Sequence, residues 1–387
     1  MLPFRSDWMT VSRVLIVGGG IAGLATAAGL RKAGISCEIV ERASQWAPVG
    51  AGIVMSVNAM SVLRRIGVGE RAADSGVELG RGAITDADGN ELSSIDFGSL
   101  RSEFGPTIAI HRAALHAALL DAAGDVPVSL STSIESLVQQ PEHVEVELTD
   151  GRQEEFDLVL GADGLHSQVR KLTFGEIPID YSGYTCWRMI VECPSDDVAM
   201  REMWGRGLRF GLAPVGNNQL YCFAVANAPR GEADPLEGRL DRFRKRFASF
   251  GGQVPDVLSA LTHPEELLHA DLEEIPKSPW FERRVALLGD AAHAMTPNMG
   301  QGAAMALEDS AVLVENLTQP GSLEERLEGW VGRRASRVRW VQNQSRRIGK
   351  IGQLEGAFGC FMRNAVMSIT PERAAAGALR KLASQPI

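Results

Sequence analysis

Near the start of the chain, three glycines stand in the order and spacing of a loop that binds a dinucleotide: Gly18, Gly20 and Gly23. The first glycine of such a loop makes a tight turn, the second lets a pyrophosphate approach the backbone, and the third lets a helix pack on a strand. The apolar run 14–17 predicts a buried parallel strand before the loop, and 21–33 predicts a helix after it. An ordinary strand–turn–helix of an α/β protein is the alternative.

The start of this helix and the next strand supply the other groups that a dinucleotide requires. Unpaired amides at a helix N-terminus, here including those of Ile21 and Ala22, favour the negative charge of a phosphate. Glu41 ends the strand predicted at 36–40 and precedes Arg42. Its carboxylate can accept hydrogen bonds from ribose hydroxyls. We therefore predict that these residues bind a cofactor.

A second polar group follows the apolar segment 157–161, which predicts another strand. Asp163 and Gly164 form a turn, and a short helix that contains Arg170 begins after it. This pattern alone is unspecific, because Asp163 could simply make an Asx-turn and Arg170 could be a solvated helix charge.

A third motif comprises Asp290, His293, Pro297, Gly300, Gln301 and Gly302. The buried-strand pattern 285–288 brings Asp290 to the carboxyl end of the predicted sheet, where open α/β sheets bind ligands. Gly300 and Gly302 open a helix that reaches about residue 317, and its free amides point into the same crevice. His293 either lines the pocket or is a packed structural histidine.

Composition excludes several classes of protein. The 387 residues predict two or three domains, and 39 basic against 48 acidic side chains give a net charge of −9. With only 6% aromatic residues, a nucleic-acid binder is not expected. The five cysteines are odd in number and lack CxxC spacing, which favours a reducing cytoplasm over a disulfide framework or a zinc site. No histidine pair has metal-ligand spacing, and the longest uncharged stretch, 14–30, centres on glycines, so we expect no metal and no stable membrane association.

The three motifs, in this order and spacing, resemble the single-component FAD-dependent aromatic hydroxylases, the group A flavoprotein monooxygenases, over roughly residues 11–317. The resemblance implies FAD as cofactor and NAD(P)H as a transient co-substrate. It further implies that a small aromatic or heteroaromatic substrate is hydroxylated with O2 by way of a flavin C4a-hydroperoxide. A reductase, dehydrogenase or epoxidase on the same scaffold, or a flavin-binding module without turnover, are the alternatives.

The resemblance also implies roles for individual residues. The family's pyrophosphate loop is matched by Gly18, Gly20 and Gly23, and its ribose-binding acid by Glu41. Arg112 matches an arginine that contacts FAD, and Asp163 with Gly164 matches a motif that serves both FAD and NAD(P)H. Asp290 matches the residue that holds the ribityl chain, and segment 297–302 matches the loop beside the isoalloxazine. Within the family, segment 207–221 resembles FAD-dependent urate hydroxylase, although salicylate and hydroxybenzoate hydroxylases are about as similar overall.

The likeness to urate hydroxylase concerns an arginine and a tyrosine that face the substrate, which here are Arg209 and Tyr221. We predict catalytic roles for these two residues together with His293 and Pro297. Asn298 departs from the pattern, since urate hydroxylase has an acid at this position. Because Arg209 lies on an alternating β segment, it requires a partner, which is either an anionic substrate or a surface ion pair.

The expected fold class is α/β. A Rossmann-like FAD-binding domain is predicted at 1–75, 102–175 and 276–325, an inserted, mostly antiparallel β-sheet substrate domain at 76–101 and 176–275, and a helical C-terminal region at 326–387. The arginines of that tail, Arg333, Arg334, Arg337 and Arg339, are predicted to form a solvated helix face. Attachment of the tail to a membrane surface is the minor alternative, and a homodimer is compatible with the sequence.

Overall fold

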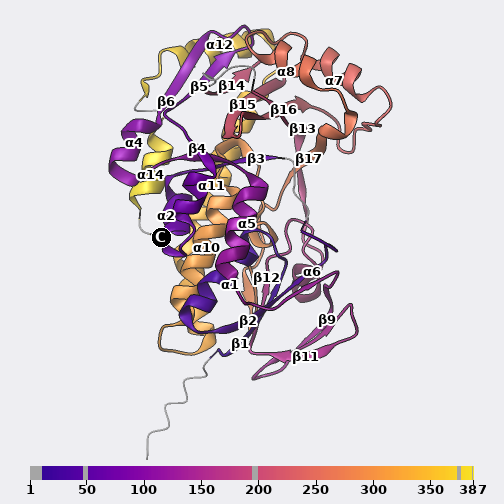
Figure 1. Ribbon diagram of the computed structural model, residues 1–387, viewed down its shortest axis with the longest axis vertical. Coiled ribbons are helices and arrows are strands. Elements are labelled where there is room, and N and C mark those ends of the chain that lie inside the picture. Colours follow the sequence, from indigo (N-terminus) through magenta and orange to yellow (C-terminus); the bar gives the residue numbers. More distant parts are fainter. Residues whose placement is uncertain (1–10, 47–50, 194–198, 373–375, 386) are drawn as a thin grey trace, which may run out of the picture.

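The computed structural model describes residues 11–46, 51–193, 199–372, 376–385 and 387, so the first ten residues of the predicted FAD-binding domain lie outside the described part. The molecule is elongated, with a parallel sheet and its helices at one end and a larger, mainly antiparallel sheet at the other (Figure 1). The α/β fold class is thereby confirmed. In the described residues no helix has the length and apolar character needed to cross a membrane.

The first sheet is built from the strands that the glycine motifs follow. Its order is β18 (Phe281–Glu282), β19 (Val285–Leu287), β12 (Leu158–Gly161), β1 (Arg13–Val17), β2 (Ser36–Glu41) and β8 (Val128–Leu130). All neighbours are parallel except β18 and β19. Since β1 and β12 are both buried and adjacent, the turns that follow them meet at one edge of the sheet.

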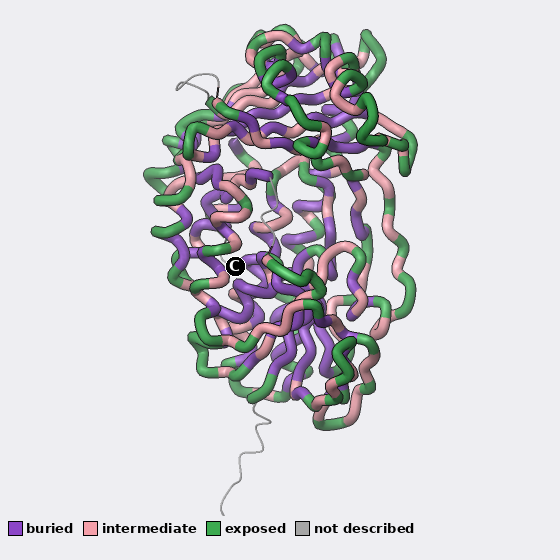
Figure 2. The backbone as a smooth tube through the Cα atoms, turned by 45° about the vertical axis from the view of Figure 1, so that its right-hand side comes forward, coloured by how far each residue is buried: buried purple, intermediate pink, exposed green. Residues whose placement is uncertain are grey.

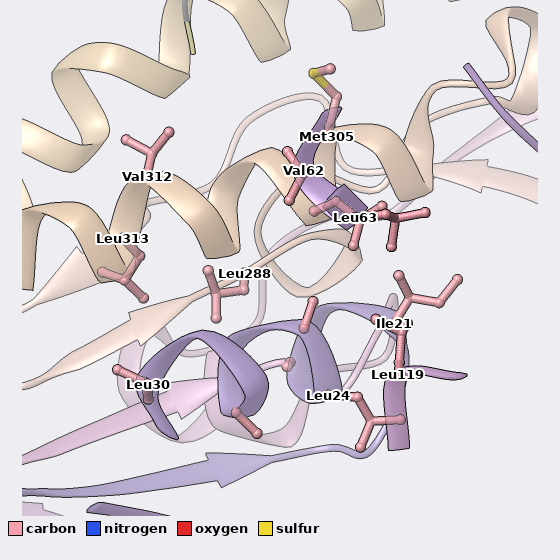
Figure 3. Close-up of a cluster of buried hydrophobic side chains, with 14 of the residues drawn as sticks. Ile21, Leu24, Leu30, Val62, Leu63, Leu119, Leu288, Met305, Val312 and Leu313 are labelled. Atoms are coloured by element: carbon pink, nitrogen blue, oxygen red, sulfur yellow. The ribbon is translucent and has the colours of Figure 1, made fainter. Parts of the chain in front are cut away.

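Helices cover one face of this sheet: α1 (Ile21–Ala33), α2 (Val57–Arg65), α3 (Gly69–Asp74), α5 (Arg112–Ala123), α10 (Gly302–Leu317) and α11 (Leu323–Gly352). Their apolar side chains interlock into the main core, in which Leu24 of α1, Leu119 of α5 and Leu313 of α10 are fully buried (Figure 3). The opposite face packs on an antiparallel sheet of β9 (Ile134–Gln139), β10 (Val144–Leu148) and β11 (Gln153–Phe156), beside α6 (Gln168–Phe174) and α9 (Asp290–His293).

The second large sheet has seven strands. Their order is β17 (Leu268–Glu274), β13 (Asp180–Glu192), β16 (Gln219–Asn227), β15 (Leu208–Gly216), β14 (Met200–Trp204), β5 (Arg81–Asp86) and β6 (Glu91–Asp96), and only the β14–β5 pair is parallel. One face packs on α7 (Arg239–Phe247) and α8 (Val254–Ala260). The other face, which we call the inner face, is turned toward a small sheet of β3 (Gly52–Met55), β7 (Ile108–His111) and β4 (Gly76–Glu78).

The helical tail is part of the core rather than an appendage. α11 packs along α10, and α14 (Gly377–Ser384) contacts α2 and α4 (Phe97–Phe104), while α12 (Ala357–Ser368) lies against β6. The prediction of a solvated arginine face is wrong for Arg334 and Arg337, which are 0% and 8% exposed, and holds for Arg333 and Arg339. Figure 2 shows the buried backbone running through the centre of both ends of the molecule.

Candidate active site

The glycine loop after β1 contains two glycines that the chain itself requires and one that it does not. A Cβ on Gly18, whose φ is +107°, would lie 2.5 Å from the carbonyl oxygen of Ala162, and a Cβ on Gly23 would lie 1.9 Å from that of Gly18. A Cβ on Gly20 would meet no atom within 4 Å, and Gly20 caps α1 without a side-chain hydrogen bond. The open space lies at the free amides of α1, so this loop fits a phosphate group.

Glu41 is tied to this loop by hydrogen bonds. Its carboxylate accepts from the amide of Gly19 at 2.8 Å and from that of Ala43 at 2.9 Å. Since a carboxylate has about four acceptor positions, two remain for ribose hydroxyls. Arg42 is exposed beside it.

An aromatic pair covers the same loop. The Trp46 ring lies over Gly19, whose Cβ would be 2.4 Å from it, and Trp46 packs on His116 at a ring distance of 5.0 Å. The Nε2 atom of His116 lies 2.9 Å from the carbonyl oxygen of Gly19. Sequence reasoning missed both residues, because no motif links them and only the fold brings α5 beside the loop.

The Asp163 carboxylate binds the start of α6 rather than forming the Asx-turn considered from the sequence. It accepts hydrogen bonds from the Ser167 hydroxyl at 2.5 Å and from the amide of Gln168 at 2.7 Å, so it fixes the start of α6. Burial raises the pKa of this carboxyl, against the effect of these bonds. Arg170 is not a solvated charge: it is 4% exposed and donates to the carbonyl oxygen of Ala291 at 2.8 Å, which joins the second motif to the third. Gly164 has a φ of +79° in the turn between them.

Asp290 and Arg112 lie near enough for their charges to interact. The Asp290 side chain is exposed, yet the surrounding protein raises its pKa, while the charges of His293 and Arg112 oppose this rise. A Cβ on Gly302, the first residue of α10, would lie 4.0 Å from Asp290 Oδ1. Arg112 begins α5, and its side chain is exposed. An accessible acid, a basic side chain and the start of a helix therefore lie together here.

His293 is a packed residue on α9, three positions after Asp290. It is 3% exposed, and its Nε2 atom lies 2.6 Å from Asp309 Oδ2. Arg334 binds Asp309 at 2.8 Å and also pairs with Glu308, so α9, α10 and α11 share one buried ion network. The structure thus supports the second of the two interpretations of His293, that of a structural histidine.

The loop that leads into α10 is held from two sides. Pro297 begins a 3₁₀ turn, η2 (Pro297–Met299), which ends at Gly300 with a φ of +60°. Gln301 is 2% exposed, and its side chain is fixed by Ser56, which accepts from Nε2 at 2.9 Å, and by Asn58, which donates to Oε1 at 3.0 Å. Pro297 and Gly300 themselves are exposed, so the loop presents its backbone outward.

Arg209 connects this loop to the inner face of the seven-stranded sheet. It is 2% exposed, and its guanidinium donates to Asn298 Oδ1 at 2.7 Å, Glu202 Oε1 at 3.0 Å and Gln353 Oε1 at 2.8 Å. Asn298 in turn donates to the Tyr184 hydroxyl at 2.9 Å. Of the two partners considered from the sequence, an ion pair is present, with Glu202, but it is largely buried rather than at the surface.

Tyr221 and Arg188 share the inner face, on the neighbouring strands β16 and β13. The Tyr221 ring packs on Gly52 of β3, where a Cβ would be 2.5 Å away. The Arg188 guanidinium lies beside the Tyr221 hydroxyl, and burial raises the pKa of that hydroxyl to about 12 despite this positive charge. No ion pair joins Arg188 to a carboxylate in the part of the chain described. Sequence reasoning missed Arg188, whose significance depends on its cross-strand position.

An open pocket of about 580 Å³ adjoins this network. Its walls include Tyr184, Asn227 and Gln353, together with Lys350 at the end of α11 and Glu355 just beyond it. Since Tyr184 and Gln353 contact the Arg209–Asn298 pair directly, the pocket reaches the protein atoms around the η2 loop.

Comparison with known proteins identifies the family. The model of the family described as "FAD binding domain" matches residues 11–339. The chain is 39% identical to aurachin C monooxygenase/isomerase of Stigmatella aurantiaca over 97% of this chain and 98% of that protein. It is 36% identical to 2-heptyl-3-hydroxy-4(1H)-quinolone synthase of Pseudomonas aeruginosa over 92% and 94%. Klebsiella pneumoniae HpxO, crystallised with FAD and uric acid, superposes with a TM-score of 0.89 at 26% identity, over 97% of each chain. The chain belongs to the FAD binding domain family and is a flavoprotein monooxygenase.

Proposed function

We propose that this enzyme uses FAD, NAD(P)H and O2 to hydroxylate a neutral, alkyl-substituted heteroaromatic ring of the 4-quinolone class. The observation that carries the proposal is the pair of Arg188 and Tyr221 on the inner face, where two hydrogen-bond donors lie without a carboxylate partner. Two such donors suit the ring carbonyl of a quinolone. The name of the relative that makes a heptyl-hydroxyquinolone supports the same substrate class.

The residues around Gly20, Glu41 and Asp290 suit FAD. Gly20 and the start of α1 would receive the pyrophosphate, Glu41 the ribose hydroxyls and Asp290 the ribityl chain, with Arg112 close by. Asp163 and Gly164 would fix the turn that precedes α6, next to the FAD site. When bound, FAD supplies the electron-transfer and oxygen-activating chemistry, with NAD(P)H as the reductant. The protein supplies no nucleophile of its own to this reaction.

The remaining residues orient the substrate and exclude water. We propose the seven-stranded sheet as the substrate-binding layer, within the boundaries 76–101 and 176–275. Tyr221 stays protonated at neutral pH because its pKa is about 12, so its hydroxyl can donate to a ring oxygen throughout turnover. Pro297 would set the approach of the loop, while His293 and Arg209 would act as positioning residues through Asp309 and Asn298.

The substrate class predicts neutral rather than anionic ligands. Arg209 already pairs with the carboxylate of Glu202, which reduces its attraction for a carboxylate substrate. A charged aromatic acid would have to leave its hydration shell to enter the space between the sheets, a cost that the guanidinium of Arg188 would offset only in part. Quinolones with an alkyl chain avoid this cost.

The test is a substrate panel with the purified holoenzyme. We would measure NAD(P)H consumption and product mass under isotopically labelled O2 with 2-alkyl-4-quinolones, urate and hydroxybenzoates, all supplied in the same detergent. The expected result is one labelled oxygen atom in a quinolone product and no product from the acids. Protein that purifies without flavin, or that oxidises NAD(P)H without labelling any quinolone, would contradict the proposal.

A further inference from the structure

Seven of the ten large apolar side chains that are exposed in the described residues lie within a single stretch, 351–369. They are Ile351, Leu354, Phe358, Phe361, Met362, Val366 and Ile369. Phe358 and Ile369 are each 79% exposed, which is far more than a packed helix shows. We call this set the α12 face.

The α12 face follows helical spacing. From Phe358 the apolar residues recur at three, four, eight and eleven positions, so they lie along one side of α12. The opposite side holds the helix on the protein: Arg363 is 6% exposed and donates to the carbonyl oxygens of Trp204 and Gly205. The helix is therefore fixed with its apolar side outward, at the end of the molecule remote from the parallel sheet (Figure 1).

We propose that the α12 face docks this enzyme on the surface of a lipid bilayer. α12 contains no acid, and its single base is the buried Arg363. The exposed basic residues Arg347 and Lys350 precede the face on α11, and Arg347 stands one turn before Ile351 on the same side. Two exposed acids, Glu355 and Glu372, also border the face and accept hydrogen bonds from Asn227 and Ser94. An apolar face whose helix carries no exposed charge of its own suits the surface of a bilayer.

A second copy of the chain fits this face less well. A stable protein interface takes roughly 20–30 residues from each partner and about ten hydrogen bonds. The α12 face has only seven exposed side chains and almost no hydrogen-bonding groups, although Phe358, Phe361 and Met362 are of types common at interfaces. Lipid requires no such complementarity.

The location of the face has a consequence for substrate access. The pocket beside Tyr184 is bounded by Lys350, Gln353 and Glu355, which belong to the segment that leads into α12. A docked molecule would hold this pocket close to the bilayer, so an apolar substrate could pass from lipid toward the inner face without entering bulk water.

The test is vesicle flotation of the holoenzyme on phosphatidylcholine vesicles that contain a minority of phosphatidylglycerol, without substrate. The double variant Phe358→Glu/Phe361→Glu removes two exposed phenylalanines. Its affinity for the vesicles should fall by roughly tenfold for each residue replaced. Val138→Glu is the matched control, because Val138 is 53% exposed but lies on β9 at the other end of the molecule. Thermal unfolding of both variants checks that they are folded.

Wild type and Val138→Glu that float, with the double variant left at the bottom, would support the proposal. Wild type that does not float, or a double variant that floats as well as wild type, would overturn it. A dimer in light scattering that the double variant dissociates, together with no flotation, would assign the face to a second copy and also overturn it. Because the assay contains no substrate, its outcome is independent of the proposed activity.

Discussion

The three glycines of the loop after β1 differ in what they indicate. Gly18 and Gly23 are required because a side chain at either position would overlap the backbone. Any protein with this strand–helix crossing would need glycine at both positions. Gly20 meets neither a forbidden angle nor a neighbour, so a ligand is the remaining reason for it. The structure therefore shows that Gly18 and Gly23 serve the fold and that Gly20 is free to serve a ligand, whereas the sequence motif contains all three without distinguishing them.

Glu41→Gln should weaken FAD retention by roughly tenfold, because the loss of a charged acceptor costs about 1.5 kcal/mol or more. The glutamine keeps one oxygen for the amide of Gly19, so the loop should remain folded. The measurement is flavin content after dilution and gel filtration. Glu38→Gln on the same strand, which breaks ion pairs with Arg13 and Arg152 away from the glycine loop, is the control and should retain its flavin. Equal flavin content in the two variants would remove the ribose assignment.

Tyr221→Phe should lower kcat/KM for a quinolone by about tenfold, the effect of one lost donor in a buried site. Since burial raises the pKa of Tyr221 to about 12, its hydroxyl is protonated below pH 10, and the loss should not change between pH 7 and pH 10. Tyr181→Phe is the control: that hydroxyl donates to the carbonyl oxygen of Ala228, and burial raises its pKa to about 12 as well. A rate defect in Tyr181→Phe as large as that in Tyr221→Phe would show that the defect is structural.

Among the elements, the start of α10 should influence the redox behaviour of the flavin. A helix N-terminus is equivalent to about half a positive charge, and reduced flavin carries negative charge. Gly302→Val would place a branched side chain between this terminus and Asp290, which is only 4.0 Å from a Cβ there. We expect a lower flavin reduction potential and slower reduction by NAD(P)H. Gly332→Val, on the exposed surface of α11, controls for a general effect of valine on a helix; an unaltered potential in Gly302→Val would place the flavin elsewhere.

The ion network between α10 and α11 should dominate the stability of the helical layer. Arg334→Met leaves Glu308 and Asp309 with fewer partners in a fully buried position, and removing one member of a buried pair costs about 3–5 kcal/mol. Arg333→Met removes the neighbouring exposed pair with Glu315 and should cost about 1 kcal/mol or less. Urea unfolding of the two variants measures the difference, and a similar midpoint for both would contradict a structural role for the network.

The same network predicts a pH dependence of folding. His293 and Arg334 hold the pKa of Asp309 below its ordinary value of 3.8, although burial alone would raise it. A lowered pKa in the folded state contributes stability above the unfolded value, and this contribution is lost as the pH falls through the folded value. The stability difference between wild type and Arg334→Met should therefore narrow below about pH 4.

At the scale of the whole molecule, the sequence predicts helices and strands from local patterns, but it does not predict which residues far apart in the chain contact each other. The helix predicted at 21–33 and the helix predicted from Gly300 and Gly302 to about residue 317 match α1 and α10, since both depend on patterns and end signals within the segment itself. Three other features depend on partners remote in sequence. Arg334 is buried because it pairs with Asp309, Arg209 donates a hydrogen bond to Gln353, and Trp46 packs on His116. No periodicity in one segment specifies such a partner, so an arginine-rich helix was predicted to face solvent.

FAD removal tests the arrangement of the whole molecule, because the predicted binding residues come from β1, α1, β2, α5, α9 and α10. A ligand that binds only the folded state stabilises it by about 2.7 kcal/mol at a hundredfold excess over its Kd, so apoprotein should unfold at a lower temperature. Amide exchange should rise on FAD removal around Gly20, Asp290 and Gly302, where the chain leaves open space or exposed groups. The antiparallel sheet β9–β11, which packs on the far face, should exchange at an unaltered rate. Protection by FAD at Gly20 but not at Gly302 would mean that the dinucleotide binds at α1 without reaching the start of α10.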